Sequence, residues 1–429
     1  MAFYFYATTQ HPVTQLISVE AITRASHRLR GVAMKTPLQR SYRLSEQYGA
    51  NVFLKREDLQ AVRSYKIRGA YNKMALLSDE QKSRGVVCAS AGNHAQGVAM
   101  ACALMEVRGM IFMPTVTPLQ KINKVRSFGK DFVEVVLVGD TYDDAYAESM
   151  IVQEEKGLAY VHPFDDRDTI AGQGTVGLEI LDQSEGPVDH VLMAVGGGGL
   201  SAGVGSVFRQ LSEETLLHGV EPAGAPAMYN SLRDGEIRTL EEIDSFVDGA
   251  AVRRVGTSNF PIIQEVLEEI LLIPEGMVCR TMLELYNEDG LVVEPAGSLS
   301  VAALDALSRK YDLTGKTIVC IIGGGNNDIT RTAEIQERAL LYEGLKHYYV
   351  IEFPQRSGAL RDFLHLLGPE DDITHFEYTK KHNRAVGPAL VGIQLQSAKD
   401  RSGLEARMLA EGVSFNHIND QPTLFQMFV

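Results

Sequence analysis

Short apolar runs that each end in a glycine- or asparagine-rich turn recur through the first 330 or so residues of this chain. Each turn leads into a segment with helical periodicity, and the clearest runs cover residues 85–90, 109–118, 132–139, 190–195 and 316–322. Strands that read as unbroken apolar runs are buried on both faces, which is typical of parallel sheets covered by helices. The sequence therefore predicts an α/β fold with parallel sheets for this region.

The pattern changes from about residue 345. Alternating apolar and polar residues predict strands at 347–354, 373–380 and 389–396, and a last strand near 414–418. Helical segments at 357–367 and 402–412 complete a βαββαβ order, which is the ferredoxin-like motif of an α+β domain. We therefore expect an α/β region in residues 1–330, a largely helical connector in 331–345 and a second domain in 346–429.

Charge and hydropathy disfavour several classes of protein. The chain has 429 residues, too many for one core, and its formal net charge of −14 disfavours binding to nucleic acids or anionic membranes. It has no apolar run of about 18 residues, so no membrane span is expected. The first 15 residues lack a basic segment, and the four scattered cysteines show no metal-type spacing. We therefore expect a cytoplasmic protein with reduced, buried cysteines.

Two turns carry candidate binding groups at the ends of predicted strands. After the strand at 190–195 comes a run of four glycines, Gly196–Gly199, whose backbone N–H groups can surround a phosphate without interference from Cβ atoms. No Lys-Ser/Thr pair follows, so this is not a triphosphate loop. The second turn, SAGNH at residues 90–94, opens a helix whose positive end can hold a carboxylate. The alternatives are a tight strand–helix turn for the first and an ordinary capped helix for the second.

The third turn, GGGNND at residues 323–328, is by itself only a glycine turn, and its importance depends on Lys66. We expect Ser64 to cap a helix that has Lys66 in its first turn. An isolated lysine is normally a solvated surface group. Three turns suited to phosphate or carboxylate, expected on one sheet, instead indicate an amino-acid substrate and a phosphorylated cofactor whose aldehyde reacts with a lysine.

At these residues the chain resembles a known family. The segments FLKREDLQAVRSYKIRGAYN, SAGNHAQG, HPFDDRDTIAGQGTVGLEI, GGGGL and VEPAGS are similar, in order and spacing, to those of the fold-type II pyridoxal-phosphate enzymes, and within them to threonine dehydratases. The resemblance implies a tryptophan synthase β-like catalytic domain in 1–330, with a small subdomain of about residues 50–155 inserted in the large one. It also implies that residues 346–429 form an ACT-like regulatory domain, as in the short biosynthetic enzymes.

The resemblance also implies roles for individual residues. Lys66 would react with the aldehyde of pyridoxal 5'-phosphate and then act on the substrate as the catalytic base. Asn93 would face the ring hydroxyl, and Gly323 would lie beside the pyridine nitrogen. The phosphate would be held by Gly196, Gly197, Gly198, Gly199 and Leu200. The substrate carboxylate would be held by Ser90, Ala91, Gly92, Asn93 and His94.

Three positions depart from related enzymes. Serine racemases have a second serine where this chain has Ala91, so the resemblance favours elimination over racemisation. Relatives usually have a serine at Gly323, so Asn326 or a water molecule would have to face the pyridine nitrogen. Metal-binding relatives pair a glutamate, here Glu221, with an aspartate where this chain has Ala227, and we therefore expect no metal.

The implied reaction is the deamination of L-threonine to 2-oxobutanoate and ammonia, the first step of isoleucine biosynthesis. Isoleucine would inhibit through the C-terminal domain, where Arg356 could receive its carboxylate, and valine would act as an antagonist. A homotetramer is the implied assembly. The alternatives are a dehydratase that also uses L-serine, a cysteine synthase-like β-replacement enzyme, and an amino-acid sensor without chemistry.

Overall fold

The computed structural model describes residues 15–378 and 385–428 and contains two compact units. The larger unit comprises Met1–Pro274 and Leu291–Asn327, and the smaller comprises Glu275–Gly290 and Asp328–Val429. Helix α12 (Glu275–Asp289) groups with the C-terminal part, because it packs against α15 (Thr332–Tyr342). The first 15 residues, which lack a basic segment, lie mostly outside the described residues.

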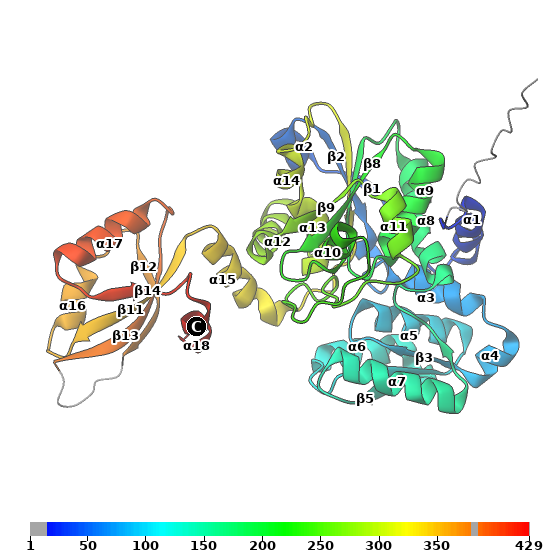
Figure 1. The fold of residues 1–429 in the computed structure, drawn as a ribbon, viewed down its shortest axis with the longest axis horizontal. Coiled ribbons are helices and arrows are strands. Elements are labelled where there is room, and N and C mark those ends of the chain that lie inside the picture. The colour runs from blue at the N-terminus through cyan, green and yellow to red at the C-terminus, as the bar shows by residue number, and fades with distance from the viewer. Residues whose placement is uncertain (1–14, 379–384, 429) are drawn as a thin grey trace, which may run out of the picture. The chain divides into compact units, whose positions relative to one another are not determined.

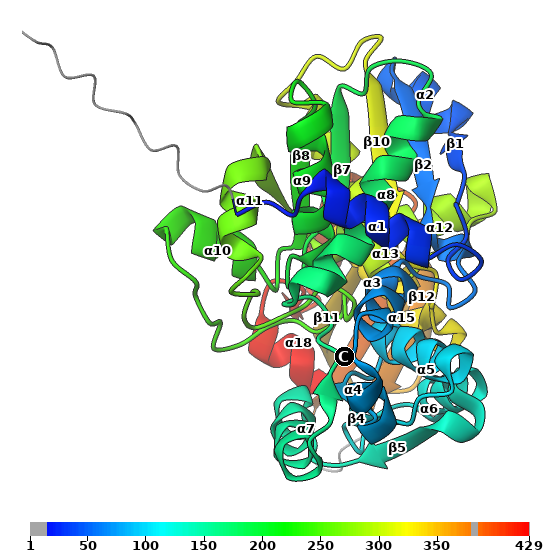
Figure 2. The same cartoon turned by 90° about the vertical axis from the view of Figure 1, so that its right-hand side faces the viewer.

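A six-stranded sheet forms the centre of the larger unit (Figure 1). Its order is β1-β2-β10-β7-β8-β9, and all neighbours are parallel except the edge strand β1. The strands are β1 (Leu38–Arg40), β2 (Asn51–Arg56), β7 (His190–Ala194), β8 (Leu216–Pro222), β9 (Glu269–Ile273) and β10 (Thr317–Ile322). Helices α1 (Val19–Arg28), α8 (Arg167–Gln183) and α9 (Gly199–Leu211) pack together on one side, as Figure 2 shows. Helix α13 (Pro295–Ala302) contacts strands β7, β8 and β10.

A second, smaller parallel sheet has the order β5-β4-β3-β6. Its strands are β3 (Val86–Ala89), β4 (Gly109–Met113), β5 (Val133–Leu137) and β6 (Ala159–Tyr160), and helices α5 (Asn93–Met105), α6 (Leu119–Gly129) and α7 (Tyr142–Lys156) accompany them. The three turns therefore do not lie on one sheet as expected: two follow β7 and β10 of the large sheet, and SAGNH follows β3 of the small one. Strand β2, inside the expected small subdomain of residues 50–155, belongs to the large sheet because it pairs with β10.

The C-terminal module confirms the predicted βαββαβ order. Its antiparallel sheet has the order β12-β13-β11-β14, and one face packs against α16 and α17 in an apolar core. The elements are β11 (Lys346–Pro354), α16 (Ala359–Leu364), β12 (Asp372–Tyr378), β13 (Val386–Gln394), α17 (Asp400–Ala410), β14 (Phe415–His417) and α18 (Pro422–Phe428). The last two residues of the strand predicted at 373–380 lie outside the described residues.

The remaining helices connect these layers. They are α2 (Tyr42–Tyr48), α3 (Lys66–Ala75), α4 (Asp79–Arg84), α10 (Ala227–Asp234), α11 (Phe260–Val266) and α14 (Leu304–Ser308), with short 3-10 turns at Glu57–Leu59, Lys130–Phe132 and Ile329–Arg331. Within residues 15–378 and 385–428, no helix is both long enough and apolar enough to cross a membrane.

Candidate active site

Lys66 is the first residue of α3, and its side chain is partly buried. Its Nζ donates a hydrogen bond to the carbonyl oxygen of Pro163 at 3.0 Å. Burial lowers the pKa of Lys66 from 10.5 to about 8, although the charge of Glu294 acts in the opposite direction. The predicted cap by Ser64 is wrong. Tyr65 occupies the cap position, and Ser64 instead pairs with Gly324 in an isolated bridge, its buried Oγ having no partner among the described atoms.

The four-glycine turn packs against the segment that contains Pro163. A Cβ atom on Gly197 would lie 2.3 Å from the ring of Phe164, and one on Gly199 would lie 3.0 Å from the Phe164 backbone. Gly198 has a φ of +96°, a conformation that side chains other than glycine rarely adopt. Asn259 Nδ2 joins the two segments by donating to the carbonyl oxygens of Gly197 (2.8 Å) and Phe164 (3.1 Å). The glycine turn is therefore connected, through Phe164, to the acceptor of the Lys66 amine.

The rest of this turn is also tightly enclosed. A Cβ atom on Gly196 would lie 3.0 Å from the carbonyl oxygen of Ala250, and Leu200 is buried in the core of the large sheet. The glycine turn has no side chains of its own and lies at the start of α9. The first N–H groups of a helix have no intrahelical partners. Such a turn is suited to an anion.

The SAGNH turn approaches Lys66 from the small sheet. Gly97, in the first turns of α5, would place a Cβ atom 3.2 Å from the Lys66 backbone. Ser90 Oγ accepts hydrogen bonds from the N–H groups of Gly92 and Ala95, each at 3.3 Å. Part of its hydrogen-bonding capacity is therefore used at the start of helix α5. His94 is buried with Nε2 2.7 Å from the carbonyl oxygen of Val161, and burial lowers its pKa to about 3. His94 is therefore neutral at pH 7.

The third turn completes the arrangement. The Gly323 carbonyl oxygen accepts the Tyr65 N–H at 3.2 Å, next to Lys66. Asn326 Nδ2 donates to Asn93 Oδ1 (2.7 Å) and to the Val62 carbonyl oxygen (2.8 Å). The hypothesis that Asn326 faces the pyridine nitrogen is therefore not supported, because its amide holds Asn93. Although the turns belong to two sheets, the structure brings all three to Lys66.

Sequence reasoning missed Glu294. This residue lies in VEPAGS, at the cap position of α13, and is only 6% exposed. Asn93 Nδ2 donates to its Oε1 at 2.6 Å, and the Asn326 N–H donates to its Oε2 at 3.2 Å. Burial raises the pKa of Glu294 to about 7. The sequence did offer one signal for Glu294, because this glutamate immediately precedes the proline that begins a helix.

A buried ionic network that the sequence analysis also missed anchors α3. Arg68 donates to Glu57 at 2.8 Å through two nitrogens and to Glu179 at 2.6 and 2.9 Å. Lys55 donates to Glu179 at 2.6 Å. These contacts join β2 and the 3-10 turn Glu57–Leu59 to helices α3 and α8.

Comparison with known proteins identifies the family. Residues 29–324 match the model of the family described as pyridoxal-phosphate dependent enzymes, and residues 337–428 match that of the C-terminal regulatory domain of threonine dehydratase. The biosynthetic L-threonine dehydratase of Halalkalibacterium halodurans is 50% identical over 96% of this chain and 99% of its own length. That of Bacillus subtilis is 51% identical over 96% of this chain and 98% of its own. The chain belongs to the threonine dehydratase family.

Solved structures of related enzymes also align with this chain. Threonine deaminase isoform 2 of Solanum lycopersicum, in its processed form, aligns with a TM-score of 0.71 and 38% identity over 76% of this chain and 95% of that one. Maize serine racemase aligns with a TM-score of 0.70 and 29% identity over 76% of this chain and 98% of that one. This family of pyridoxal-phosphate dependent enzymes therefore shares the catalytic fold described above.

The residues at this site fit the cofactor of the family. An aldehyde requires a neutral amine, and Lys66 has a lowered pKa. A phosphate requires N–H groups without Cβ atoms, which the turn at Gly196–Gly199 supplies. Two buried polar atoms near this turn, Ser201 Oγ and Asn259 Oδ1, have no hydrogen-bond partner among the described atoms.

Both carboxyl oxygens of Glu221 are engaged by the backbone. Its Oε1 and Oε2 accept the backbone N–H groups of Met228 (2.9 Å) and Tyr229 (2.8 Å) at the start of α10. Burial raises its pKa to about 8. In the described part of the chain, no group of three or more His, Cys, Asp or Glu side chains could hold a metal.

Proposed function

We propose that this chain deaminates L-threonine to 2-oxobutanoate and ammonia with pyridoxal 5'-phosphate as its cofactor. The observation that carries the proposal is the Lys66 amine, partly buried, with a pKa of about 8, at the point where three ligand-binding turns meet. The family assignment and the names of the relatives support threonine as the substrate. The reaction places the enzyme at the first step of isoleucine biosynthesis.

The roles of the site residues follow from their chemistry. Lys66 binds the cofactor through its aldehyde, and the turn Gly196–Gly199 with Leu200 binds the phosphate. Asn93 would face the ring hydroxyl, and Gly323 would lie beside the pyridine nitrogen. The substrate carboxylate is held at the start of α5 by Ser90 and the backbone from Ala91 to His94.

The cofactor, when bound, supplies an electron sink for the charge left at Cα. Lys66 removes the Cα proton, because an amine with a pKa of about 8 is partly neutral at pH 7. Ala91 has no group that exchanges a proton, so the site lacks a hydroxyl there for the opposite face of Cα. This asymmetry favours elimination over racemisation. Serine also reacts, because one methyl group changes binding by only about 1–3 kcal/mol.

Isoleucine is the proposed inhibitor, and the regulatory module offers a cavity for it. A cavity of about 300 Å³ is lined by groups of both charges and by apolar side chains, among them Leu341, His347, Arg401, His417, Asp420 and Phe425. An amino acid needs a cation for its carboxylate, an anion for its ammonium and an apolar wall for its side chain. Valine, which has a shorter side chain, is the proposed antagonist at the same place.

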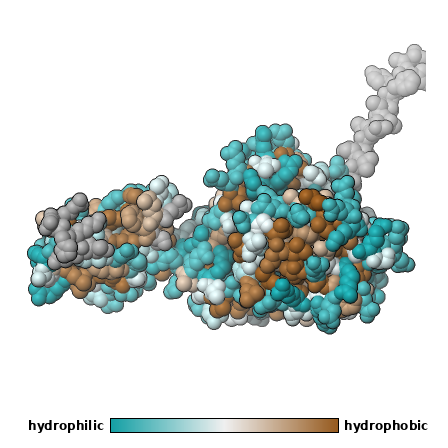
Figure 3. All heavy atoms as spheres, turned by 90° about the horizontal axis from the view of Figure 1, so that it is seen from below, coloured by the Kyte–Doolittle hydropathy of each residue, from teal (hydrophilic) through white to brown (hydrophobic). Residues whose placement is uncertain are grey.

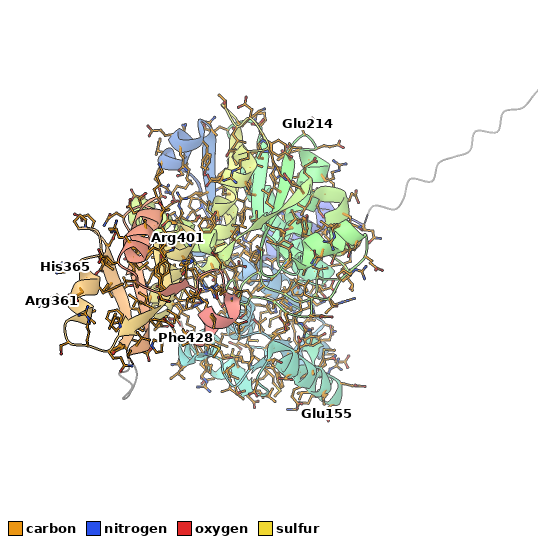
Figure 4. All side chains as sticks on the ribbon, turned by 60° about the vertical axis from the view of Figure 1, so that its left-hand side comes forward. Glu155, Glu214, Arg361, His365, Arg401 and Phe428 are labelled. Atoms are coloured by element: carbon orange, nitrogen blue, oxygen red, sulfur yellow. The ribbon has the colours of Figure 1, made fainter. Side chains whose placement is uncertain are left out.

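The sequence-based expectation for the effector site, Arg356, has less structural support. Its guanidinium forms an ion pair with Asp362 at 2.8 Å, and α16 has only six residues. Figure 4 shows Arg401 away from Arg361, which lies on α16, and from His365, which follows that helix. We therefore prefer the cavity beside Arg401 over the loop before α16.

We also propose a cytoplasmic homotetramer. All four cysteines are free and buried, which suits a reducing compartment. Figure 3 shows a broad hydrophobic area on one face of the larger unit, and such areas mark contacts between proteins. Light scattering of the purified protein tests the tetramer directly.

One experiment separates the candidate functions. One sample of cofactor-loaded protein is reduced with borohydride and digested to locate the label. A second, unreduced sample is given threonine or serine, and the 2-oxo acid formed (2-oxobutanoate or pyruvate) is measured. We expect the label on Lys66, product from threonine and serine, and loss of both label and activity in Lys66→Ala. Threonine binding without product would favour the sensor. Product only from an activated serine and a sulfide donor would favour the β-replacement enzyme. An unlabelled Lys66 in the wild type would overturn the proposal.

A further inference from the structure

The orientation of the Asn93 amide is determined by a chain of hydrogen bonds. Lys124 Nζ, which can only donate, lies 3.1 Å from Asn326 Oδ1, and the Val62 carbonyl oxygen, which can only accept, lies 2.8 Å from Asn326 Nδ2. Asn326 therefore cannot be turned over without losing both bonds. Its Nδ2 faces Asn93, so the oxygen of Asn93 must point towards Asn326. The nitrogen of Asn93 must then point towards the carboxylate of Glu294.

Glu294 is the last member of this series of hydrogen bonds, and each of its two oxygens faces a donor. Its Oε1 accepts from Asn93 Nδ2 at 2.6 Å, and its Oε2 accepts from the Asn326 N–H at 3.2 Å. Above its pKa of about 7, Glu294 is an ionised carboxylate with acceptors only, whereas an amide of the same shape would present a donor at one of these two positions. The turn makes room for it, since a Cβ atom on Gly324 would lie 2.2 Å from Glu294 Oε1.

The Asn93 amide keeps one N–H group for another partner. A primary amide carries two N–H groups, and Glu294 takes one of them. We propose that Glu294 is a positioning residue, which makes Asn93 present an N–H group, and not its oxygen, to the ring hydroxyl of pyridoxal phosphate. This inference rests on the proposed function, in which Asn93 faces that hydroxyl. A donor at this oxygen stabilises its anionic form, whereas an acceptor would stabilise the neutral hydroxyl.

The test is the absorption spectrum of the cofactor-loaded enzyme in the absence of substrate. Glu294→Gln keeps the size of the side chain and places a donor against either Asn93 Nδ2 or the Asn326 N–H. We expect the visible band to move from the long-wavelength form, with an anionic ring oxygen, towards the short-wavelength form with a neutral hydroxyl. We also expect kcat/KM to fall by about 10- to 100-fold, because the ring is held less accurately.

Glu221→Gln is the matched control. Glu221 is also buried, and its two carboxyl oxygens also accept two N–H groups. Those N–H groups belong to the start of α10 and not to the proposed cofactor site. We expect this variant to lose thermal stability and to keep the wild-type spectrum. If both variants show the same spectral change, or if Glu294→Gln shows none, the positioning role is wrong.

A second variant covers the case in which Glu294→Gln does not fold. Asn326→Asp removes the donor that faces Asn93 Oδ1, and it should shift the spectrum in the same direction. An unchanged spectrum in a folded, loaded Asn326→Asp enzyme would contradict the inference. The failure of the proposed function is distinguishable, because in that case the wild type itself would carry no borohydride-reducible cofactor on Lys66.

Discussion

The Lys66 amine donates a hydrogen bond to the Pro163 carbonyl oxygen at 3.0 Å, and this contact holds the end of a partly buried cation against the backbone. The partner is neutral, so it does not compensate for the loss of hydration, and burial lowers the pKa of Lys66 to about 8. The consequence is an amine of which about a tenth is neutral at pH 7.

The first prediction concerns the reactivity of this amine. At pH 7 a lysine with a pKa of about 8 is about 300-fold richer in neutral amine than a lysine with the ordinary value of 10.5. In the cofactor-free enzyme, acylation of Lys66 should level off above about pH 8, while exposed lysines of the same chain continue to gain reactivity. Mass spectrometry of labelled peptides measures both in one sample. A Lys66 profile that rises in parallel with the exposed lysines would contradict the lowered pKa.

The second prediction concerns the ion pair between Arg68 and Glu57, both of which are almost fully buried. Arg68→Leu leaves Glu57 without its main cation, and removal of one partner of a buried pair costs about 3–5 kcal/mol. Urea unfolding at pH 7 measures this loss. Arg24→Leu is the control, because the Arg24–Glu20 pair is 69% and 72% exposed and should matter little.

The same pair predicts a dependence on pH. Burial would raise the pKa of Glu57, but the charges of Arg68 and Lys55 outweigh it, and the folded pKa lies below 4.5. The pair therefore stabilises the fold above the unfolded pKa, and this contribution is lost as pH falls through the folded pKa. Without Arg68, burial raises the pKa of Glu57, so the gap in stability between variant and wild type should narrow on acidification. If the difference in free energy of unfolding between wild type and Arg68→Leu widens on acidification, the predicted direction of the pH effect is wrong.

The third prediction concerns the glycine turn. In Gly197→Ala the new Cβ atom would lie 2.3 Å from the Phe164 ring, and overpacking of this kind costs about 1–3 kcal/mol. Because Phe164 follows the Pro163 acceptor of Lys66, we expect cofactor affinity to fall by about tenfold or more. Gly186→Ala is the control, since no atom lies within 4 Å of its Cβ position. Cofactor titration and thermal unfolding distinguish weakened binding from a damaged fold.

Much of the architecture was predictable because local patterns encode it. β7 and β10 are continuous apolar runs followed by glycines, and they became neighbouring strands with the turns at the same edge. The alternating strands of the C-terminal module likewise followed from periodicity alone. Such features depend on residues that are close together in the sequence.

The unpredicted features depend on contacts between distant residues. Glu294 lies 201 positions from Asn93, and no local pattern indicates that the two meet. Arg68 was not expected in the core because charged side chains are rarely buried without a partner, and its partner Glu179 is 111 positions away. Ser64 has the residue type of a helix cap, but its backbone pairs with Gly324, and this pairing decides where α3 begins.

The fourth prediction concerns the effector cavity beside Arg401. The Arg401 guanidinium bonds Glu405 at 2.8 Å and His417 at 3.1 Å, which orients it at the cavity wall. Loss of a charge-assisted hydrogen bond costs about 1.5–3 kcal/mol, so Arg401→Gln should raise the isoleucine concentration for half-inhibition by about 10- to 100-fold. The activity without isoleucine should not change, because Arg401 belongs to the regulatory module.

Two controls decide whether this effect is specific. Arg361→Gln removes an exposed cation from α16, away from Arg401 (Figure 4), and should leave inhibition unchanged. Glu405→Gln keeps the Arg401 cation but weakens its support, so it should give a smaller shift in the same direction. If Arg361→Gln abolishes inhibition while Arg401→Gln does not, the effector binds near α16, as the sequence first suggested. Calorimetric titration of isoleucine into each variant separates lost binding from lost coupling, because only lost binding removes the heat.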